Sequence, residues 1–298
     1  MSQSATASVQ PQPLLVRKVR DLLETVRPEH TIFALPFAYM ALFLAEGGLP
    51  RFHVFLWITL AFTGARFAGM AINRLADADL DKRIPRNQRR AIPAGRLKRV
   101  EVLLFIAASL GLFVGSSYPL GFWPSVLWPA VVAALVMSPY PKRFFWGSNL
   151  SIGMVYFLIP SGVWVAARDE IGLAPVLLGV SSALWNTGFD TLYRCQDAEV
   201  DRRLGLHSFA ADFGVARALW IARLMHVGTS MALLVLGLYL HVGPWYYAGL
   251  GVAAMCFVYQ HRLVKADDLS RLNRAFFTMN GLISMVHFVF VVVDTAVT

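Results

Sequence analysis

Two groups of oxygen-bearing side chains carry the clearest chemical information in the sequence. The first is formed by Asn73, Asp77 and Asp81, each four residues after the one before. In a helix, steps of four keep side chains on one face, so an amide and two carboxylates form one column. The second group is formed by acids alone. It is built from Asp190, Asp197 and Asp201, which follow one another at steps of seven and then four residues.

Both columns point to the same chemistry. Carboxylates repel one another unless cations lie between them, and acids at membrane depth are costly and usually functional. Mg²⁺ prefers hard oxygen ligands and binds carboxylates together with substrate phosphates. All six side chains are therefore candidate metal ligands around a Mg²⁺-bridged diphosphate. The alternative is that both columns are ordinary surface acids at solvated helix ends. The neighbouring Asp79 and Glu199 point away from the columns, and we expect them to be solvated or to pair with Arg74 and Arg203.

A diphosphate also needs positive charge from the protein. Lys142 and Arg143 stand together between two apolar segments, and we expect both to bind phosphate oxygens. The segment after the first column is rich in arginine, and arginine suits bidentate phosphate contacts. Of these residues we select Arg90, because residues 92–95 (Ile-Pro-Ala-Gly) would hold its loop in a defined shape.

Arg66 differs from the other cations because it lies inside an apolar segment, seven residues before Asn73. A buried arginine needs an anion or a set of hydrogen-bond acceptors. It could neutralise Asp190 or another column member, or it could bind the carboxylate of an acidic substrate. The sequence leaves both possibilities open.

The elements that carry these residues must lie in a membrane. Of the 298 residues, 57% are hydrophobic and only 15% are charged, and the mean hydropathy is +0.55. Soluble domains usually contain about 25% charged residues. The composition excludes a disordered chain, a disulfide scaffold and a coiled coil. The two cysteines, Cys195 and Cys256, form no CxxC pair, so structural zinc is not expected.

The apolar segments predict an all-α bundle of nine transmembrane helices, since one span needs about 20 apolar residues. Two double-length runs break at turn signals near residues 118–121 and 241–244. The expected spans are 31–47, 52–73, the two parts of 102–141, 144–167, 171–190, the two parts of 224–261, and 275–293. The columns recur four helices apart, which suggests two related four-helix halves followed by a ninth helix.

The distribution of charge predicts the orientation. All Lys and Arg residues except Arg51, Arg66 and Arg168 fall in alternate loops or at the N-terminus. The positive-inside rule then places the N-terminus and both columns on the cytoplasmic side, and no nucleic-acid partner is needed to explain the net charge of +9. Residues 1–13 are expected to be a disordered tail, residues 15–30 a surface-lying amphipathic helix, and residues 14–298 a single domain.

The two columns resemble the motifs of the UbiA superfamily of intramembrane prenyltransferases. That family has NxxxDxxxD, here residues 73–81, and DxxxD preceded by an Asp seven residues upstream, here residues 190–201. The resemblance extends from about residue 29 to 277. The stretches 33–37, 64–66, 92–95 and 188–208 are closest to the MqnP and 4-hydroxybenzoate polyprenyltransferase branch. The family's YxxxK is incomplete, because Ser138 stands four residues before Lys142, and Tyr140 two before it.

The resemblance implies Mg²⁺-dependent transfer of a polyprenyl group from its diphosphate to an aromatic acid of the dihydroxynaphthoate or 4-hydroxybenzoate type, in menaquinone or ubiquinone biosynthesis. In this mechanism Asp77, Asp81, Asp197 and Asp201 act as catalytic residues through Mg²⁺. The resemblance further implies that the protein is integral to the bacterial inner membrane and binds both substrates at a site facing the cytoplasm. Among other classes of protein, a secondary transporter also combines paired halves with intramembrane carboxylates, although its site usually lies near the midplane. The sequence does not indicate the oligomeric state.

Overall fold

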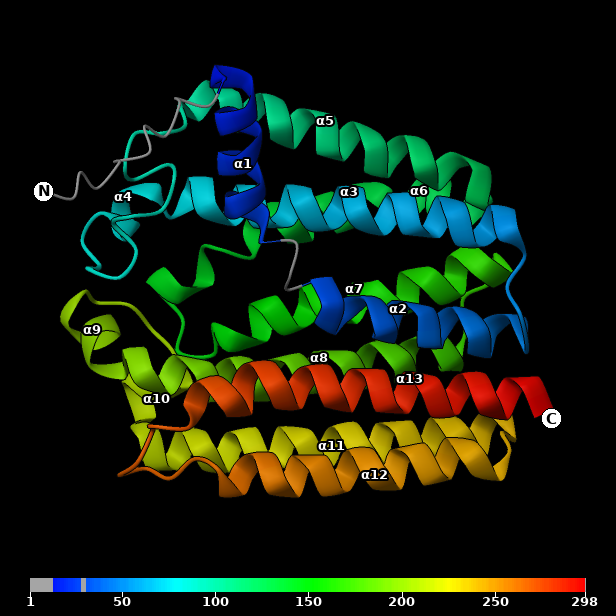
Figure 1. The fold of residues 1–298 in the computed structure, drawn as a ribbon. Coiled ribbons are helices and arrows are strands. Elements are labelled where there is room, and N and C mark those ends of the chain that lie inside the picture. Colours follow the sequence, from blue (N-terminus) through cyan, green and yellow to red (C-terminus); the bar gives the residue numbers. More distant parts are fainter. Residues whose placement is uncertain (1–12, 28–30, 298) are drawn as a thin grey trace, which may run out of the picture.

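The computed structural model describes residues 13–27 and 31–297, and within these ranges it contains helices and no strands. The predicted tail, residues 1–13, lies outside the described residues except for Pro13. The long helices are α2 (Thr31–Glu46), α3 (Phe52–Ala76), α5 (Arg99–Ser117), α6 (Phe122–Met137), α7 (Asn149–Arg168), α8 (Leu173–Arg194), α11 (Val215–Leu240), α12 (Pro244–Arg262) and α13 (Met279–Val297). They run alongside one another in a single bundle (Figure 1).

Six of the described helical segments are long and apolar enough to cross a membrane, those containing α3, α5, α6, α7, α11 and α13. The apolar part of α2 is shorter, Leu35–Glu46. Helices α8 and α12 have 22 and 19 residues, but they are less apolar. For α8 the reason is its position: it packs against α7 on one side and α11 on the other, so most of its surface meets protein rather than lipid.

Two hydrophobic cores hold the bundle together. The larger joins α2, α7, α8, α11, α12 and α13 with the first half of α3, and Trp185 of α8 is fully buried in it. The smaller joins α1 (Leu14–Val26), the second half of α3, the loop 82–98 and α5. Because α2 packs against α7 and α13, the two packing units differ from the two predicted four-helix halves.

The short helices gather at one end of the bundle. These are α4 (Ala78–Asp81), α9 (Ala198–Arg203) and α10 (Phe209–Phe213), while α13 ends at the opposite end (Figure 1). Helix α1 crosses α3 near the end that carries α4. Its inner face is fixed by Arg96, which bonds both Asp21 and Glu24, and its outer face exposes Leu14, Leu15 and Val16. This amphipathic division agrees with the prediction over residues 15–26, while residues 28–30 of the predicted helix lie outside the described residues.

Candidate active site at the end of the bundle

The first motif lies where α3 ends. Helix α3 stops at Ala76, and Asp77 leads into the single turn of α4. The backbone hydrogen bonds nevertheless continue in steps of four, from Asp77 N to Asn73 O (3.0 Å) and from Asp81 N to Asp77 O (2.8 Å). The three predicted side chains therefore stay on successive turns even though the helix is interrupted. Asp77 and Asp81 are both buried.

The second motif is interrupted in a similar way. Asp190 lies in the last turns of α8, Asp197 ends the 3₁₀ turn Cys195–Asp197, and Asp201 lies in α9. Asp190 accepts a hydrogen bond of 2.7 Å from the Asn149 amide at the start of α7. A 3₁₀ turn that ends at Asp197 thus interrupts the helix between Asp190 and Asp201, so the motif is not one continuous column.

Side chains from distant parts of the chain bring the two motifs together. Arg86, in the loop after the first motif, donates to Asp197 of the second. Lys142, in the 3₁₀ turn Pro141–Arg143, donates to Asp77 of the first. The motifs therefore face each other at one end of the bundle rather than at its midplane, which is unlike a typical transporter site.

The remaining predicted cations also have defined partners. Arg90 donates to both carboxylate oxygens of Asp81, at 2.8 and 2.7 Å. Arg143 donates to the Ala76 carbonyl oxygen at 2.7 Å and lies 3.8 Å from Asp77 Oδ1. All three cations predicted to bind diphosphate are thus placed at the first motif.

Burial weakens the acids of the second motif. It raises the pKa of the Asp197 carboxyl to about 6, against the opposing effect of Arg86. It also raises the pKa of Asp201, against Arg194. Titratable groups whose pKa values are shifted by burial and by neighbouring charges cluster at functional sites.

The donor set suits Mg²⁺, which prefers oxygen ligands. Asp77 Oδ1 is buried and has no hydrogen-bond partner in the part of the chain that the structure describes. No group of three His, Cys, Asp or Glu side chains is already assembled for a metal among residues 13–27 and 31–297. The side chains therefore fit the ion chemically, but they would have to draw together around it.

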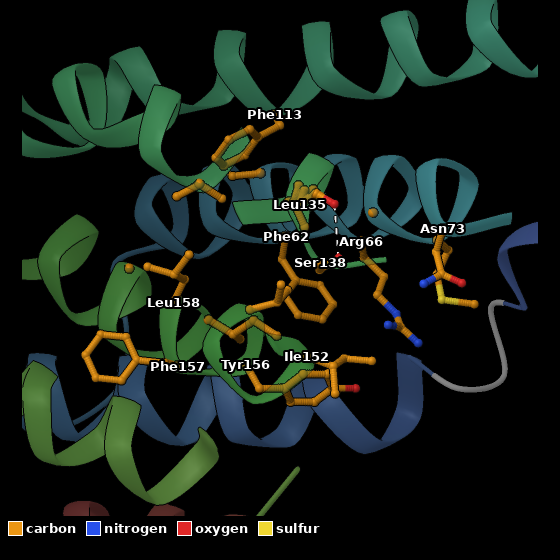
Figure 2. A pocket seen from close by; sticks show the side chains of 18 of the residues that line it. Phe62, Arg66, Asn73, Phe113, Leu135, Ser138, Ile152, Tyr156, Phe157 and Leu158 are labelled. Atoms are coloured by element: carbon orange, nitrogen blue, oxygen red, sulfur yellow. Dashed lines mark hydrogen bonds between the residues drawn. The ribbon is translucent and has the colours of Figure 1, made fainter. Parts of the chain in front are cut away.

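A cavity of about 750 Å³ begins at these motifs and extends along the bundle between α3, α6 and α7. Asn73, Asp190 and Tyr193 border its polar end. Its other walls are mostly apolar, with the labelled side chains of Phe62, Leu158 and others around one space (Figure 2). An elongated apolar space with one polar end suits an amphiphilic ligand.

Arg66 extends from α3 into this cavity, towards Ile152 and Tyr156 (Figure 2). Its Nε atom is buried without a hydrogen-bond partner among the described residues. Asp190 is satisfied by Asn149 instead, so Arg66 is not the partner of that acid. Of the two predicted roles, the structure leaves Arg66 available to an anion that enters the cavity.

Several site residues were not selected from the sequence. Arg86 belongs to the arginine-rich loop, but its sequence position does not distinguish it from Arg90. Arg194 lies four residues after Asp190, and the same four-residue spacing could have found it. Asn149 has no sequence motif. Tyr140 is exposed beside Arg143, whose guanidinium lies 5.2 Å from the ring centroid, and it is Ser138 that borders the cavity.

The two acids that the spacing sets apart from the motifs also lie apart from them in space. Asp79 pairs with Lys82 and Arg99 rather than with Arg74. Glu199 pairs with Arg203, as predicted.

Comparison with known proteins identifies the family and the fold. The family profile described as the UbiA prenyltransferase family matches residues 34–282. The 4-hydroxybenzoate octaprenyltransferase of Aeromonas salmonicida (strain A449) is 31% identical over 258 residues, which is 85% of this chain and 88% of that relative. The apo structure of a UbiA homolog from Aeropyrum pernix K1 superposes with a TM-score of 0.79 and 28% identity, covering 89% of this chain and 98% of that one.

A second solved structure resembles the fold at lower identity. It is the UbiA homolog from Archaeoglobus fulgidus bound to DMAPP and Mg²⁺, with a TM-score of 0.70 and 16% identity. It covers 93% of this chain and 100% of that one. At this identity the similarity establishes the shared fold.

Proposed function

This chain belongs to the UbiA prenyltransferase family of aromatic prenyltransferases, and we propose that it transfers a polyprenyl group from its diphosphate to an aromatic acid with the help of Mg²⁺. The observation that carries this proposal is the pair of contacts that cations make to the acids of the motifs, Arg86 to Asp197 and Lys142 to Asp77, at the polar end of an apolar cavity. An acid-lined mouth holds a metal–diphosphate, and the apolar space holds a hydrocarbon tail.

The acids of both motifs would hold the metal, with Asn73, Asp77 and Asp81 on one side and Asp190, Asp197 and Asp201 on the other as candidates. Mg²⁺, when bound, supplies Lewis-acid stabilisation of the leaving diphosphate. Lys142, Arg143, Arg90 and Arg86 donate hydrogen bonds to the same oxygens. When the metal binds, the cations that pair with acids in this structure would leave those carboxylates, which then bind the metal, and would donate to the phosphate oxygens instead.

The cavity performs the remaining tasks. When the allylic C–O bond breaks, its electrons leave with the diphosphate and an allylic cation remains. The apolar walls exclude water that would otherwise quench this cation. Arg66 donates to the acceptor's carboxylate and orients the ring, whose carbon attacks the cation and then loses its proton to the departing diphosphate.

The names of the relatives favour an acceptor of the 4-hydroxybenzoate type, and hence ubiquinone biosynthesis. A dihydroxynaphthoate acceptor of menaquinone biosynthesis is the second candidate, which follows from the sequence resemblance. Both have the carboxylate that Arg66 would bind. We further propose that residues 14–298 form a single domain crossing the bacterial inner membrane nine times, with the N-terminus and the site on the cytoplasmic side, where Lys and Arg are concentrated.

The full chain in detergent or nanodiscs tests this function directly. It is supplied with Mg²⁺, a polyprenyl diphosphate and either 4-hydroxybenzoate or a dihydroxynaphthoate, and both the prenylated product and released pyrophosphate are measured. We expect both to appear together and to stop when EDTA removes the metal. A transporter would release no pyrophosphate, and absence of product with every aromatic acid would overturn the proposal.

A further inference from the structure

Arg194 and Asp201 form an ion pair inside the second motif. Arg194 is the last residue of α8, and its guanidinium donates to Asp201 Oδ2 at 3.1 Å. Both side chains are largely buried, with 15% and 8% of their surfaces exposed. The sequence spacing groups Asp201 with the metal-binding acids, whereas the structure supplies it with an internal counter-ion.

This pair differs from the other acid–cation pairs of the site in how firmly the cation is held. Arg194 also donates to Ser148 Oγ at 2.8 Å and to the His207 carbonyl oxygen at 3.2 Å. By contrast, the hydrogen bonds of the Lys142 and Arg90 side chains all go to a single carboxylate each. Those two cations can turn to a diphosphate by leaving one acid, whereas Arg194 would have to break two further hydrogen bonds in a buried site.

The acceptors of Arg194 connect it to the diphosphate-binding segment. Ser148 Oγ donates to the His207 carbonyl oxygen at 2.7 Å, and the His207 backbone N–H donates to the Lys142 carbonyl oxygen at 2.7 Å. The Lys142 side chain then reaches Asp77 of the first motif. One chain of hydrogen bonds thus runs from Asp201 through Arg194 to Lys142.

We propose that Arg194 and Asp201 are positioning residues, a buried ion pair that holds the Lys142 segment in place, and that Asp201 is not a metal ligand in this protein. The metal is then held by the remaining acids of the two motifs and Asn73. This inference rests on the proposed function, because it concerns the same metal–diphosphate site. It separates Asp201 from Asp197, which spacing alone treats as equivalent.

Metal binding distinguishes the two acids without measuring turnover. Mn²⁺ is used as a paramagnetic substitute for Mg²⁺, and its binding to the full chain is followed by EPR in the presence of inorganic pyrophosphate. We expect Asp197→Asn to weaken Mn²⁺ binding by about tenfold or more. With pyrophosphate at saturating concentration, we expect Asp201→Asn, and the double variant Arg194→Gln/Asp201→Asn, to bind Mn²⁺ like the unchanged protein, because both keep every proposed metal ligand.

A thermal double-mutant cycle tests the ion pair itself. Removing one partner leaves the other charge buried and unpaired, so each single variant should lower Tm. The double variant should lose less than the sum of the two single losses. Arg203→Gln is the matched control, because Arg203 lies in α9 but its pair with Glu199 is exposed, and we expect its Tm to be unchanged.

A kinetic measurement tests the connection to Lys142. Arg194→Gln should raise the KM for the prenyl diphosphate more than the KM for the aromatic acceptor, because Lys142 loses its support. Arg194→Lys should recover part of that loss by restoring the charge beside Asp201.

The outcomes separate this inference from the function on which it rests. If Asp201→Asn weakens Mn²⁺ binding as much as Asp197→Asn does, Asp201 is a ligand and the inference is wrong. Additive losses of Tm in the cycle would also overturn it. If the unchanged protein binds no Mn²⁺ with pyrophosphate, it is the proposed function that fails, and the thermal cycle still decides whether the ion pair is structural.

Discussion

The Arg86 guanidinium donates to the Asp197 carboxylate, so the loop that follows the first motif closes onto the second. The guanidinium also lies 5.7 Å from the centroid of the Tyr193 ring, at the polar end of the cavity. A cation in this place can neutralise Asp197 before the substrate arrives and contact a diphosphate afterwards. Two groups 111 positions apart in the sequence thereby become parts of one site.

Loss of this contact should weaken diphosphate binding. We expect Arg86→Gln to raise the KM for the prenyl diphosphate by roughly tenfold, because one charge-assisted hydrogen bond is lost. Arg83→Gln, in the same loop but at a position that does not border the cavity, is the control and should have little effect. Steady-state kinetics with each substrate varied in turn would show the difference, and equal effects of the two substitutions would contradict the role of Arg86.

Asp77 should be indispensable for transfer but not for folding. We expect Asp77→Ala to reduce kcat/KM by at least about a hundredfold, equivalent to ~3 kcal/mol of transition-state stabilisation. Asp79→Ala provides the comparison, because Asp79 is exposed and pairs with Lys82 and Arg99 away from the cavity. Size-exclusion profiles and Tm should confirm that both variants fold. Substantial Mg²⁺-dependent turnover by Asp77→Ala would refute the metal assignment.

Arg66 should discriminate in favour of acceptors that carry a carboxylate. We expect Arg66→Ala to raise the KM for 4-hydroxybenzoate by about tenfold, since its buried Nε atom lacks a hydrogen-bond partner within the described chain. The KM for the prenyl diphosphate should change much less. The KM for a neutral acceptor such as 4-hydroxybenzamide should be nearly the same with and without the substitution. Equal increases in KM for both substrates would argue against carboxylate binding.

Replacing Gly162 by a larger residue should limit the length of the prenyl tail that the cavity accepts. Gly162 borders the cavity about 20 Å along α7 from Asn149, and a Cβ atom placed on it meets no atom within 4 Å. We expect Gly162→Trp to shift the ratio of kcat/KM towards farnesyl over octaprenyl diphosphate by about tenfold.

The control for this variant is Gly251→Trp in α12. A Cβ atom there also meets open space, but Gly251 does not border the cavity. Competition between the two diphosphates, followed by mass spectrometry of the products, measures the ratio. An unchanged ratio in Gly162→Trp would mean that the tail does not pass this point.

Stabilisation by Mg²⁺ should depend on pH through Asp197. Because burial raises the pKa of this acid to about 6, the metal-free fold holds a proton there that the unfolded chain has already lost. Its contribution to metal-free stability therefore falls as the pH rises from about 4 to 6. Mg²⁺ competes with that proton, so the increase in Tm caused by Mg²⁺ should be small below about pH 5.5 and grow above it. Asp197→Asn should largely remove this pH dependence.

The sequence by itself determined which residues carry the chemistry and roughly where the helices lie. Hydropathy is a local property, so apolar runs locate spans, and residues four apart share a helix face whatever surrounds them. These rules placed Asn73, Asp77 and Asp81 on successive turns, and they predicted Arg66 in an apolar setting. They did not show that α3 breaks at Asp77, because no Pro or Gly marks that break.

Only the tertiary structure decided which cation meets which acid. Arg86 and Arg90 have the same side chain in the same loop, yet one crosses to Asp197 and the other stays with Asp81. Helical periodicity relates residues within a few turns, but contacts between distant segments depend on how the helices pack. The same packing buries Arg194 beside Asp201 and leaves the Arg66 Nε atom without a hydrogen-bond partner among the described residues. The surroundings of these two arginines therefore became visible only once the chain was folded.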